Sequence, residues 1–116
     1  MVKIAVMGYG VVGSGTVEVF YKNLSSIETK VGDKADIKYI LDLRDFSGTP
    51  YDDKFIKDFN IILNDPEITV AVEVIGGINP SYGFVKSLLE AGKSVVTSNK
   101  ELVAEKGAEL LRIARE

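Results

Sequence analysis

The sequence predicts an α/β protein in which a doubly wound parallel sheet lies between helices, in a three-layer α/β/α sandwich. Two observations favour this class. Short apolar segments rich in β-branched residues alternate along the chain with segments whose apolar residues recur at helical spacing. Most of the apolar segments lack polar alternation, which is typical of parallel strands that helices cover on both faces.

The first half of the chain is predicted to hold two strands and one long helix. Residues 2–7 read V-K-I-A-V-M and form the first strand, and helical periodicity then extends from about residue 11 to residue 24. Residues 25–36 are polar and are predicted to form a loop, and residues 37–41 form the second strand. Residues 44–53 are predicted to be a further loop, because they contain a glycine, a proline and several charges.

The next segments predict a short helix, a strand and a longer helix. The short helix spans residues 58–64, with an aspartate as its cap, and the third strand spans residues 69–75. Asn79 is predicted to be the N-cap of the longer helix and Pro80 its first residue. Gly92 then lies just past the end of this helix, where glycine is favoured.

A fourth strand at residues 94–97 and a helix at residues 100–114 complete the chain, with Ser98 and Asn99 as capping residues. The residues predicted to turn inward from this helix are Leu102, Val103, Leu110, Ile113 and Ala114. A strand normally follows in this architecture, so we expect the chain to be truncated after this fourth strand–helix unit. The fourth strand is then an exposed edge, which predicts self-association into a homo-oligomer.

The composition argues against several classes of function. The chain has no cysteine and no histidine, so disulfides, a thiolate nucleophile and the commonest metal ligand are excluded, and we expect no metal site. The net charge is −3 and the charges are spread along the chain, so we expect no nucleic-acid partner. No apolar stretch approaches the roughly 18 residues of a membrane-spanning helix. We therefore expect no membrane partner and a cytoplasmic location.

A glycine-rich turn follows the first strand. Gly8, Gly10 and Gly13 match G-x-G-x-x-G, in which the first glycine allows a tight turn, the second lets the backbone approach a pyrophosphate, and the third lets the helix pack closely. The amides of Val11, Val12 and Gly13 would then bind the phosphates at the positive end of the helix. Its position between strand and helix favours dinucleotide binding over a purely structural turn. Residues 1–116 are therefore predicted to be a Rossmann-like domain that binds NAD or NADP.

Two charged residues follow the second strand, where the adenine ribose of a dinucleotide would lie. Asp42 is placed to accept hydrogen bonds from both ribose hydroxyls, the NAD pattern, and Arg44 could bind a 2′-phosphate, the NADP pattern. The sequence leaves both cofactors open. A solvated ion pair at a strand end is the alternative.

The ligand crevice is expected where the connections of the sheet diverge, between the carboxyl ends of the first and third strands. The third strand ends there with Ile75, Gly76 and Gly77. These residues would let the backbone pass close to the nicotinamide side of the cofactor. An ordinary turn after the strand explains the two glycines equally well.

The fourth strand brings Thr97, Asn99 and Lys100 to the same rim. Lys100 begins a helix, where the dipole disfavours a cation, so ligand contact and a solvated surface lysine are both open. Glu73 lies in a strand that should be buried. It must therefore pair, with Asn99 or Lys100 as candidates, unless the strand is partly exposed at this position.

Four segments carry a family resemblance: G-Y-G-V-V-G-S-G at 8–15, D-P-E-I at 65–68, V-E-V-I-G-G at 72–77 and A-G-K-S-V-V-T-S-N-K-E-L-V-A at 91–104. Together they resemble the N-terminal nucleotide-binding region of homoserine dehydrogenase. The match extends from residue 2 to residue 111.

This resemblance implies an NAD(P)-dependent oxidoreductase that interconverts L-aspartate 4-semialdehyde and L-homoserine, in the biosynthesis of threonine, methionine and isoleucine. It also implies that Lys100 lies between the nicotinamide and the small-molecule substrate, where it contacts cofactor or transfers a proton. The substrate domain of the family is absent, so we expect the 116 residues alone to be inactive. The alternatives are another two-domain NAD(P)-dependent dehydrogenase and an NAD-binding regulatory module without chemistry.

Overall fold

Five strands form one sheet in the computed structural model, which describes residues 2–42, 51–75, 77 and 79–115 of the chain. The strands are β1 (Val2–Met7), β2 (Ala35–Leu41), β3 (Phe55–Ile56), β4 (Ile68–Glu73) and β5 (Ser94–Thr97). The helices that connect and follow them are α1 (Val11–Lys22), α2 (Leu24–Val31), the 3₁₀ helix η1 (Asp52–Lys54), α3 (Phe59–Leu63), α4 (Ser81–Glu90) and α5 (Lys100–Arg115).

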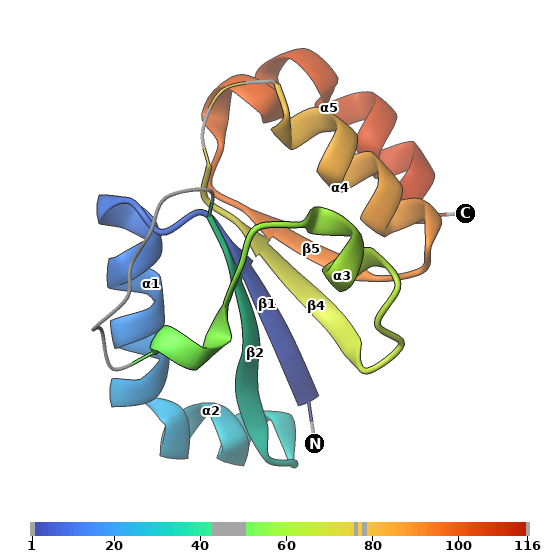
Figure 1. Cartoon of the computed structure of the whole chain (residues 1–116). Coiled ribbons are helices and arrows are strands. Elements are labelled where there is room, and N and C mark those ends of the chain that lie inside the picture. The colour runs from blue at the N-terminus through green and yellow to red at the C-terminus, as the bar shows by residue number, and fades with distance from the viewer. Residues whose placement is uncertain (1, 43–50, 76, 78, 116) are drawn as a thin grey trace.

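The order of the strands in the sheet is β3-β2-β1-β4-β5, and every pair is parallel (Figure 1). β1 lies between β2 and β4, so the chain leaves β1 in one direction across the sheet and later returns to its other side. This is the strand order of a doubly wound Rossmann-like sheet. It confirms the predicted fold class and puts the topological switch point between β1 and β4.

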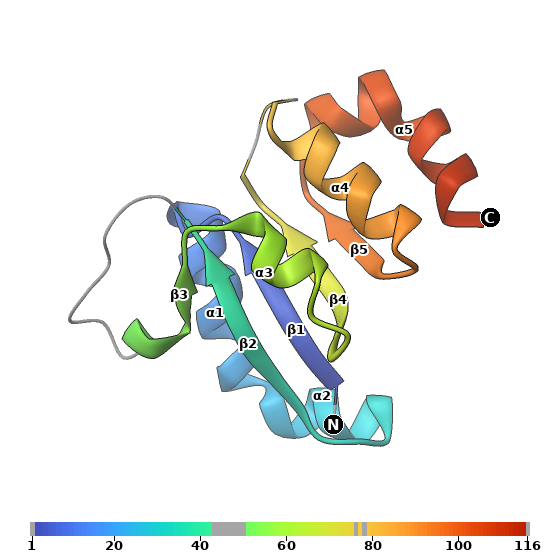
Figure 2. The ribbon, with the colours of Figure 1, turned by 45° about the vertical axis from the view of Figure 1, so that its right-hand side comes forward.

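Helices cover both faces of the sheet, α1 on one face and α3 with α4 on the other (Figure 2). Val17 of α1 shares a buried cluster with Val6 of β1. On the opposite face, Ile62 of α3 and Leu88 of α4 share a buried cluster with Met7. Because successive residues of β1 are buried on opposite faces, the strand reads as a continuous apolar run.

The predicted loop at residues 25–36 is wrong, because Leu24–Val31 form the helix α2. No residue of α2 is fully buried, so its apolar stripe is too short to stand out against its polar residues. The helix ends at Gly32, whose φ of 80° is left-handed. The side chain of Glu28 accepts a hydrogen bond of 2.9 Å from the amide of Ala35, where β2 begins two residues earlier than predicted.

Further differences from the prediction concern β3, β4 and α4. The strand predicted at residues 69–75 is β4 at Ile68–Glu73, so it ends two residues earlier than expected. The two-residue strand β3 was not foreseen, since so short a segment shows no periodicity. The helix α4 begins at Ser81 with Pro80 as its N-cap, so the predicted cap Asn79 lies one residue too early. The predicted stop is confirmed, because Gly92 follows the helix with a φ of 82°. The predicted cap Asp58 is confirmed, since its carboxylate accepts a 2.9 Å bond from the amide of Asn60.

The helix α5 packs against α4 through a narrower stripe than the sequence predicts. Leu102 and Leu110 are buried as expected, and Ile113 is half-buried. Val103 and Ala114 are exposed, so their predicted inward orientation is wrong. A helix that lies along one neighbouring helix buries fewer of its positions than a helix that lies flat on a sheet.

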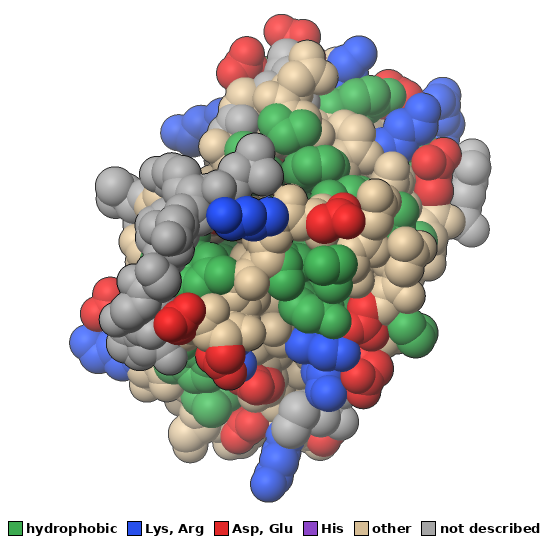
Figure 3. All heavy atoms as spheres, in the orientation of Figure 1, with side chains coloured by type: hydrophobic (Ala, Val, Ile, Leu, Met, Phe, Trp, Pro, Cys, Tyr) green, Lys and Arg blue, Asp and Glu red, His purple; other side chains and the backbone are tan. Residues whose placement is uncertain are grey.

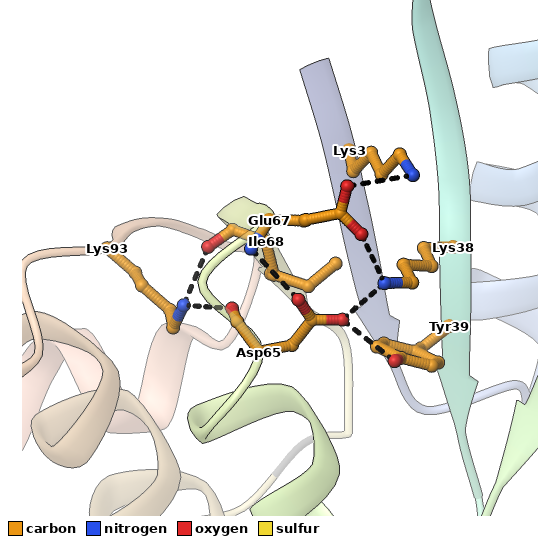
Figure 4. Close-up of polar contacts among 7 residues, drawn as sticks. All are labelled: Lys3, Lys38, Tyr39, Asp65, Glu67, Ile68 and Lys93. Carbon is orange, nitrogen blue, oxygen red and sulfur yellow. Dashed lines mark hydrogen bonds and ion pairs between the residues drawn. The ribbon is translucent and has the colours of Figure 1, made fainter. Parts of the chain in front are cut away.

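A polar cluster fastens the end of the sheet opposite the glycine turn (Figure 4). The carboxylate of Asp65 accepts hydrogen bonds from Lys38 Nζ at 2.5 Å and from the Tyr39 hydroxyl at 2.8 Å. Lys93 Nζ donates to the carbonyl of Asp65 at 2.8 Å and to that of Ile68 at 2.7 Å. The cluster therefore ties β2 and the loop before β5 to the turn that leads into β4.

Candidate dinucleotide site

A pocket of about 500 Å³ opens at the carboxyl ends of β1, β2 and β4. Five of the residues that the sequence singled out line it: Gly8, Gly10, Val12, Asp42 and Ile75. Because β1 and β4 flank the topological switch point, the pocket lies where ligands bind in open α/β sheets. On the surface of the molecule, hydrophobic side chains gather near the middle of the face that α3 and α4 cover, with charged side chains around them (Figure 3).

The first and third glycines of the turn cannot carry a side chain. Gly8 has a left-handed φ of 103°, and an added Cβ would lie 3.1 Å from the carbonyl oxygen of Val74. An added Cβ at Gly13 would lie 2.0 Å from the carbonyl oxygen of Gly8, a contact that no small adjustment relieves. The absence of side chains therefore lets α1 approach the turn and the end of β4 closely, as the motif predicts.

The helix α1 begins directly at the turn. Gly10 is its N-cap, with φ −75° and ψ −155°, and its carbonyl accepts the helix bond from the amide of Ser14 at 2.9 Å. The amides of Val11, Val12 and Gly13 precede that bond and belong to the first turn, whose amides have no acceptor within the helix. They lie at the positive end of the helix dipole, which suits an anion.

Asp42 is held against the glycine turn. Its Oδ2 accepts a 2.9 Å hydrogen bond from the backbone amide of Tyr9, and its side chain lines the pocket. The strand end and the turn therefore meet as the sequence predicts. Arg44, the second predicted charge, lies outside the described residues.

The residues that line the pocket on the side of α3 and α4 are not predicted from the sequence. The rings of Phe59 and Phe84 stack with their centroids 4.1 Å apart, and both line the pocket. Lys57 lines it as well and is exposed. These residues follow β3 or lie on α4, so only the positions of those elements in the fold bring them to the glycine turn.

Three other predicted residues line a separate hollow of about 330 Å³ at the carboxyl end of β5. Thr97, Asn99 and Lys100 line it, and Lys100 is exposed at the first position of α5. Asn99 caps α5, because its Oδ1 accepts a 3.1 Å bond from the amide of Leu102. Lys100 therefore lies at the carboxyl end of the sheet, as predicted, but does not line the first pocket.

The end of β4 connects the two hollows. Glu73 is fully buried, which decides between the two alternatives that the sequence left open in favour of a buried, paired carboxylate. Its carboxylate accepts hydrogen bonds from the Thr97 hydroxyl at 2.6 Å and the Ser81 hydroxyl at 3.2 Å. The predicted partner Asn99 instead donates to the carbonyl of Gly77.

Gly77, which follows in the loop, has a left-handed φ of 74°, as a turn glycine would. Its predicted neighbour Gly76 lies outside the described residues.

Within the described part of the chain, no helix combines the length and the hydropathy that a membrane crossing needs.

Comparison with known proteins places these features in one family. The family model described as homoserine dehydrogenase, NAD binding domain, matches residues 8–116. The homoserine dehydrogenase of Lactococcus lactis is 34% identical over an alignment of 121 positions, which covers 97% of this chain and 28% of that protein. The homoserine dehydrogenase of Pseudomonas aeruginosa is 37% identical over an alignment of 120 positions, which covers 99% of this chain and 27% of that protein.

Solved structures agree with the sequence comparison. The crystal structure of a homoserine dehydrogenase from Thiobacillus denitrificans superposes with a TM-score of 0.90 at 30% identity, covering 98% of this chain and 27% of that one. The chain thus spans little more than a quarter of the length of the curated relatives it matches. Because the family model matches nearly all of its residues, the chain belongs to the family of homoserine dehydrogenase NAD-binding domains.

Proposed function

We propose that this chain binds NAD or NADP as the nucleotide-binding part of a homoserine dehydrogenase. The whole enzyme would interconvert L-aspartate 4-semialdehyde and L-homoserine, in the biosynthesis of threonine, methionine and isoleucine. The observation that carries the proposal is the glycine turn, which faces the switch-point pocket and is bonded to Asp42 through the amide of Tyr9. Family membership supports the same assignment.

The residues present fit a dinucleotide. The first-turn amides of α1 would hold the pyrophosphate, and the carboxylate of Asp42 would accept bonds from the ribose hydroxyls. The apolar walls formed by Phe59 and Phe84 suit a flat aromatic ring. Arg44 remains a candidate for a 2′-phosphate on its sequence position alone. When bound, the cofactor would supply the hydride acceptor or donor of an oxidoreductase.

The remaining residues are assigned to the nicotinamide side of the site. Ile75 and Gly77 follow β4, while Thr97 and Asn99 follow β5. We assign these four residues, with Gly76 by its position in the sequence, to cofactor contact. Lys100 lies on the same rim, and we assign it to the junction of cofactor and substrate.

We further propose that the whole enzyme is a cytoplasmic homo-oligomer that acts on a small molecule, with no nucleic-acid or membrane partner. A net charge of −3 with no basic run supports the absence of a polyanionic partner.

Calorimetric titration tests the proposal: the 116-residue chain is titrated with NADH and, separately, with NADPH. We expect saturable binding of at least one of the two dinucleotides at a single site. ADP-ribose should compete, because the glycine turn and Asp42 would bind the adenosine half of the cofactor. A chain that is folded and binds neither dinucleotide would contradict the proposed function.

A further inference from the structure

We infer that Glu73 is a positioning residue that holds the two segments on the nicotinamide side of the site in one arrangement. These segments are the loop that leaves β4 and the turn from β5 into α5 that carries Lys100. The inference rests on the proposed function. It assigns a task to a residue that is fully buried and therefore cannot itself contact a ligand.

The carboxylate of Glu73 joins three segments: the loop just after β4, the start of α4 and the end of β5. Its Oε2 accepts hydrogen bonds from the amide of Ile75 at 2.8 Å and from the hydroxyl of Ser81, the first residue of α4, at 3.2 Å. Its Oε1 accepts a 2.6 Å bond from the hydroxyl of Thr97 at the end of β5. In the sheet, Glu73 pairs with Met7 of β1 on one side and with Thr97 on the other.

Further hydrogen bonds connect Glu73, through Thr97 and Asn99, to the start of α5, where Lys100 lies. The hydroxyl oxygen of Thr97 accepts a 3.0 Å bond from the amide of Asn99 while donating its own proton to Glu73. Asn99 then caps α5 through its side chain and donates to the carbonyl of Gly77 in the loop after β4. The carboxylate of Glu73 thus holds the ends of β4 and β5 together, and the hydrogen bond from Asn99 to Gly77 is a second link between the segments that follow these strands.

A fully buried carboxylate has a high desolvation cost, which an apolar residue at the same position would not have. The bonds to Ile75 and Thr97 fall on the segments assigned to the nicotinamide side. The adenosine side is built differently, from the glycine turn and from Asp42, which is bonded to Tyr9. If Glu73 is a positioning residue, its loss should therefore weaken binding of the nicotinamide half of the dinucleotide and leave binding of the adenosine half unchanged.

The decisive experiment compares two ligands on the 116-residue chain. NADH spans both halves of the proposed site, whereas ADP-ribose lacks the nicotinamide. In Glu73→Gln, an amide nitrogen replaces one acceptor oxygen, so either Thr97 or the Ile75 and Ser81 pair faces a donor. We expect Glu73→Gln to weaken NADH binding about tenfold and to change ADP-ribose binding less than about twofold, in line with the loss of one hydrogen bond to a charged group.

A second pair of variants tests the same link from the other side. Thr97→Val removes the hydroxyl and should reproduce the selective loss of NADH affinity, while Thr97→Ser keeps the hydroxyl and should restore it. Tyr82→Phe is the matched control. It removes a 2.6 Å hydrogen bond from α4 to Glu109 of α5, away from both hollows, and should leave the affinities for both ligands unchanged.

The outcomes separate the inference from the proposed function. Wild-type chain that binds neither ligand contradicts the proposed function and the inference with it. If the wild type binds both ligands and the variants lose both equally, or lose neither, Glu73 is only a structural residue and the inference is wrong. Should Glu73→Gln fail to fold, Glu73→Asp decides by the same comparison of NADH with ADP-ribose, because it keeps the charge but shortens the side chain that bonds both Ile75 and Thr97.

Discussion

The three glycines of the turn have different tasks, and this difference can be tested one residue at a time. Gly8 and Gly13 are required by the fold, through a left-handed φ and through a close backbone contact. Gly10 has an ordinary φ of −75° that alanine also adopts, and it lines the pocket. We therefore expect Gly10→Ala to fold normally and to lose at least about tenfold in dinucleotide affinity, ~1.4 kcal/mol.

Gly15→Ala is the matched control for Gly10→Ala. A Cβ at Gly15 meets no atom within 4 Å, and the residue lies in α1 outside the pocket lining. It should bind dinucleotide as the wild type does. Calorimetric affinities of both variants, with their melting temperatures, decide the matter, and equal affinity in the two would show that the turn is only structural.

Lys100 is expected to act on the reaction rather than on cofactor affinity. It is exposed at the start of α5 and lines the hollow next to Thr97 and Asn99, not the pocket of the glycine turn. An ammonium there can donate to a substrate carbonyl oxygen on which negative charge grows. In the complete enzyme proposed above, Lys100→Ala should lower kcat by about 10²-fold, while NADH affinity changes little.

Steady-state kinetics of the Lys100→Ala variant, together with a cofactor titration, distinguish the two roles of the lysine. A variant that keeps its kcat and only needs more cofactor would assign Lys100 to binding. Lys100→Arg is a useful companion, because it keeps the charge but cannot transfer a proton at neutral pH.

At the scale of single residues, the sequence predicts those site residues that belong to a recognisable motif or directly follow a predicted strand. The glycine turn lies within one strand–turn–helix unit, and Asp42 follows the strand next to it, so the pairing of β1 with β2 brings both to the pocket. Lys57 and Phe59 could not be assigned to the pocket, because they reach it only through the position of β3 and α3 at the edge of the sheet. The partners of Glu73 were missed since register, not spacing along the chain, sets Thr97 beside it.

At the scale of elements, periodicity identifies those that bury a broad face. β1, β4, α1 and α4 were predicted on their apolar patterns, because each of them contributes to a core cluster. The helix α2 was missed because it has no fully buried residue. Its stability depends on its neighbours and on a left-handed glycine at its end, neither of which gives a periodic pattern.

Gly107 tests how α5 is stabilised. An added Cβ at Gly107 would meet Cγ1 of Val103, at 3.4 Å, within the same helix. Among the described residues, nothing therefore requires a glycine there. Gly107→Ala should raise the free energy of unfolding by about 0.5–1 kcal/mol, through the higher helix propensity of alanine. Urea denaturation measures the change, and a loss of stability would reveal a close neighbour of Gly107.

At the scale of the whole molecule, the sheet ends in an open edge at β5. Among the described residues, β5 pairs only with β4, and its Val96 is 57% exposed. An open edge with an exposed apolar side chain favours association between copies. We expect the chain to self-associate with rising concentration in sedimentation experiments, and Val96→Lys to shift the population toward the monomer. A wild-type chain that stays monomeric throughout would contradict this expectation.

The opposite end of the sheet predicts how the whole molecule responds to acid. Hydrogen bonds from Lys38, and to a lesser degree from the Glu67 amide and from Tyr39, lower the pKa of Asp65 from its usual 3.8 to about 2. The Asp65 side chain is only 11% exposed, and its bonds connect β2 to the turn before β4. Because the folded state holds this proton less tightly than the unfolded state, the contribution of Asp65 is complete above about pH 5 and is lost as the pH falls toward 2.

We therefore expect the free energy of unfolding to fall between about pH 5 and pH 2, and Asp65→Asn to remove part of that dependence. The variant should be less stable than the wild type at pH 6, since Lys38 and Tyr39 lose a charged acceptor, and the two stability curves should converge at low pH.

Lys38 and Lys3 also lower the pKa of Glu67, so some acid sensitivity remains in the variant. Glu105→Gln, on the exposed side of α5, is the control that should leave the acid profile intact. Urea midpoints measured across this range decide the outcome, and parallel curves for wild type and Asp65→Asn would show that this cluster does not set the acid stability of the sheet.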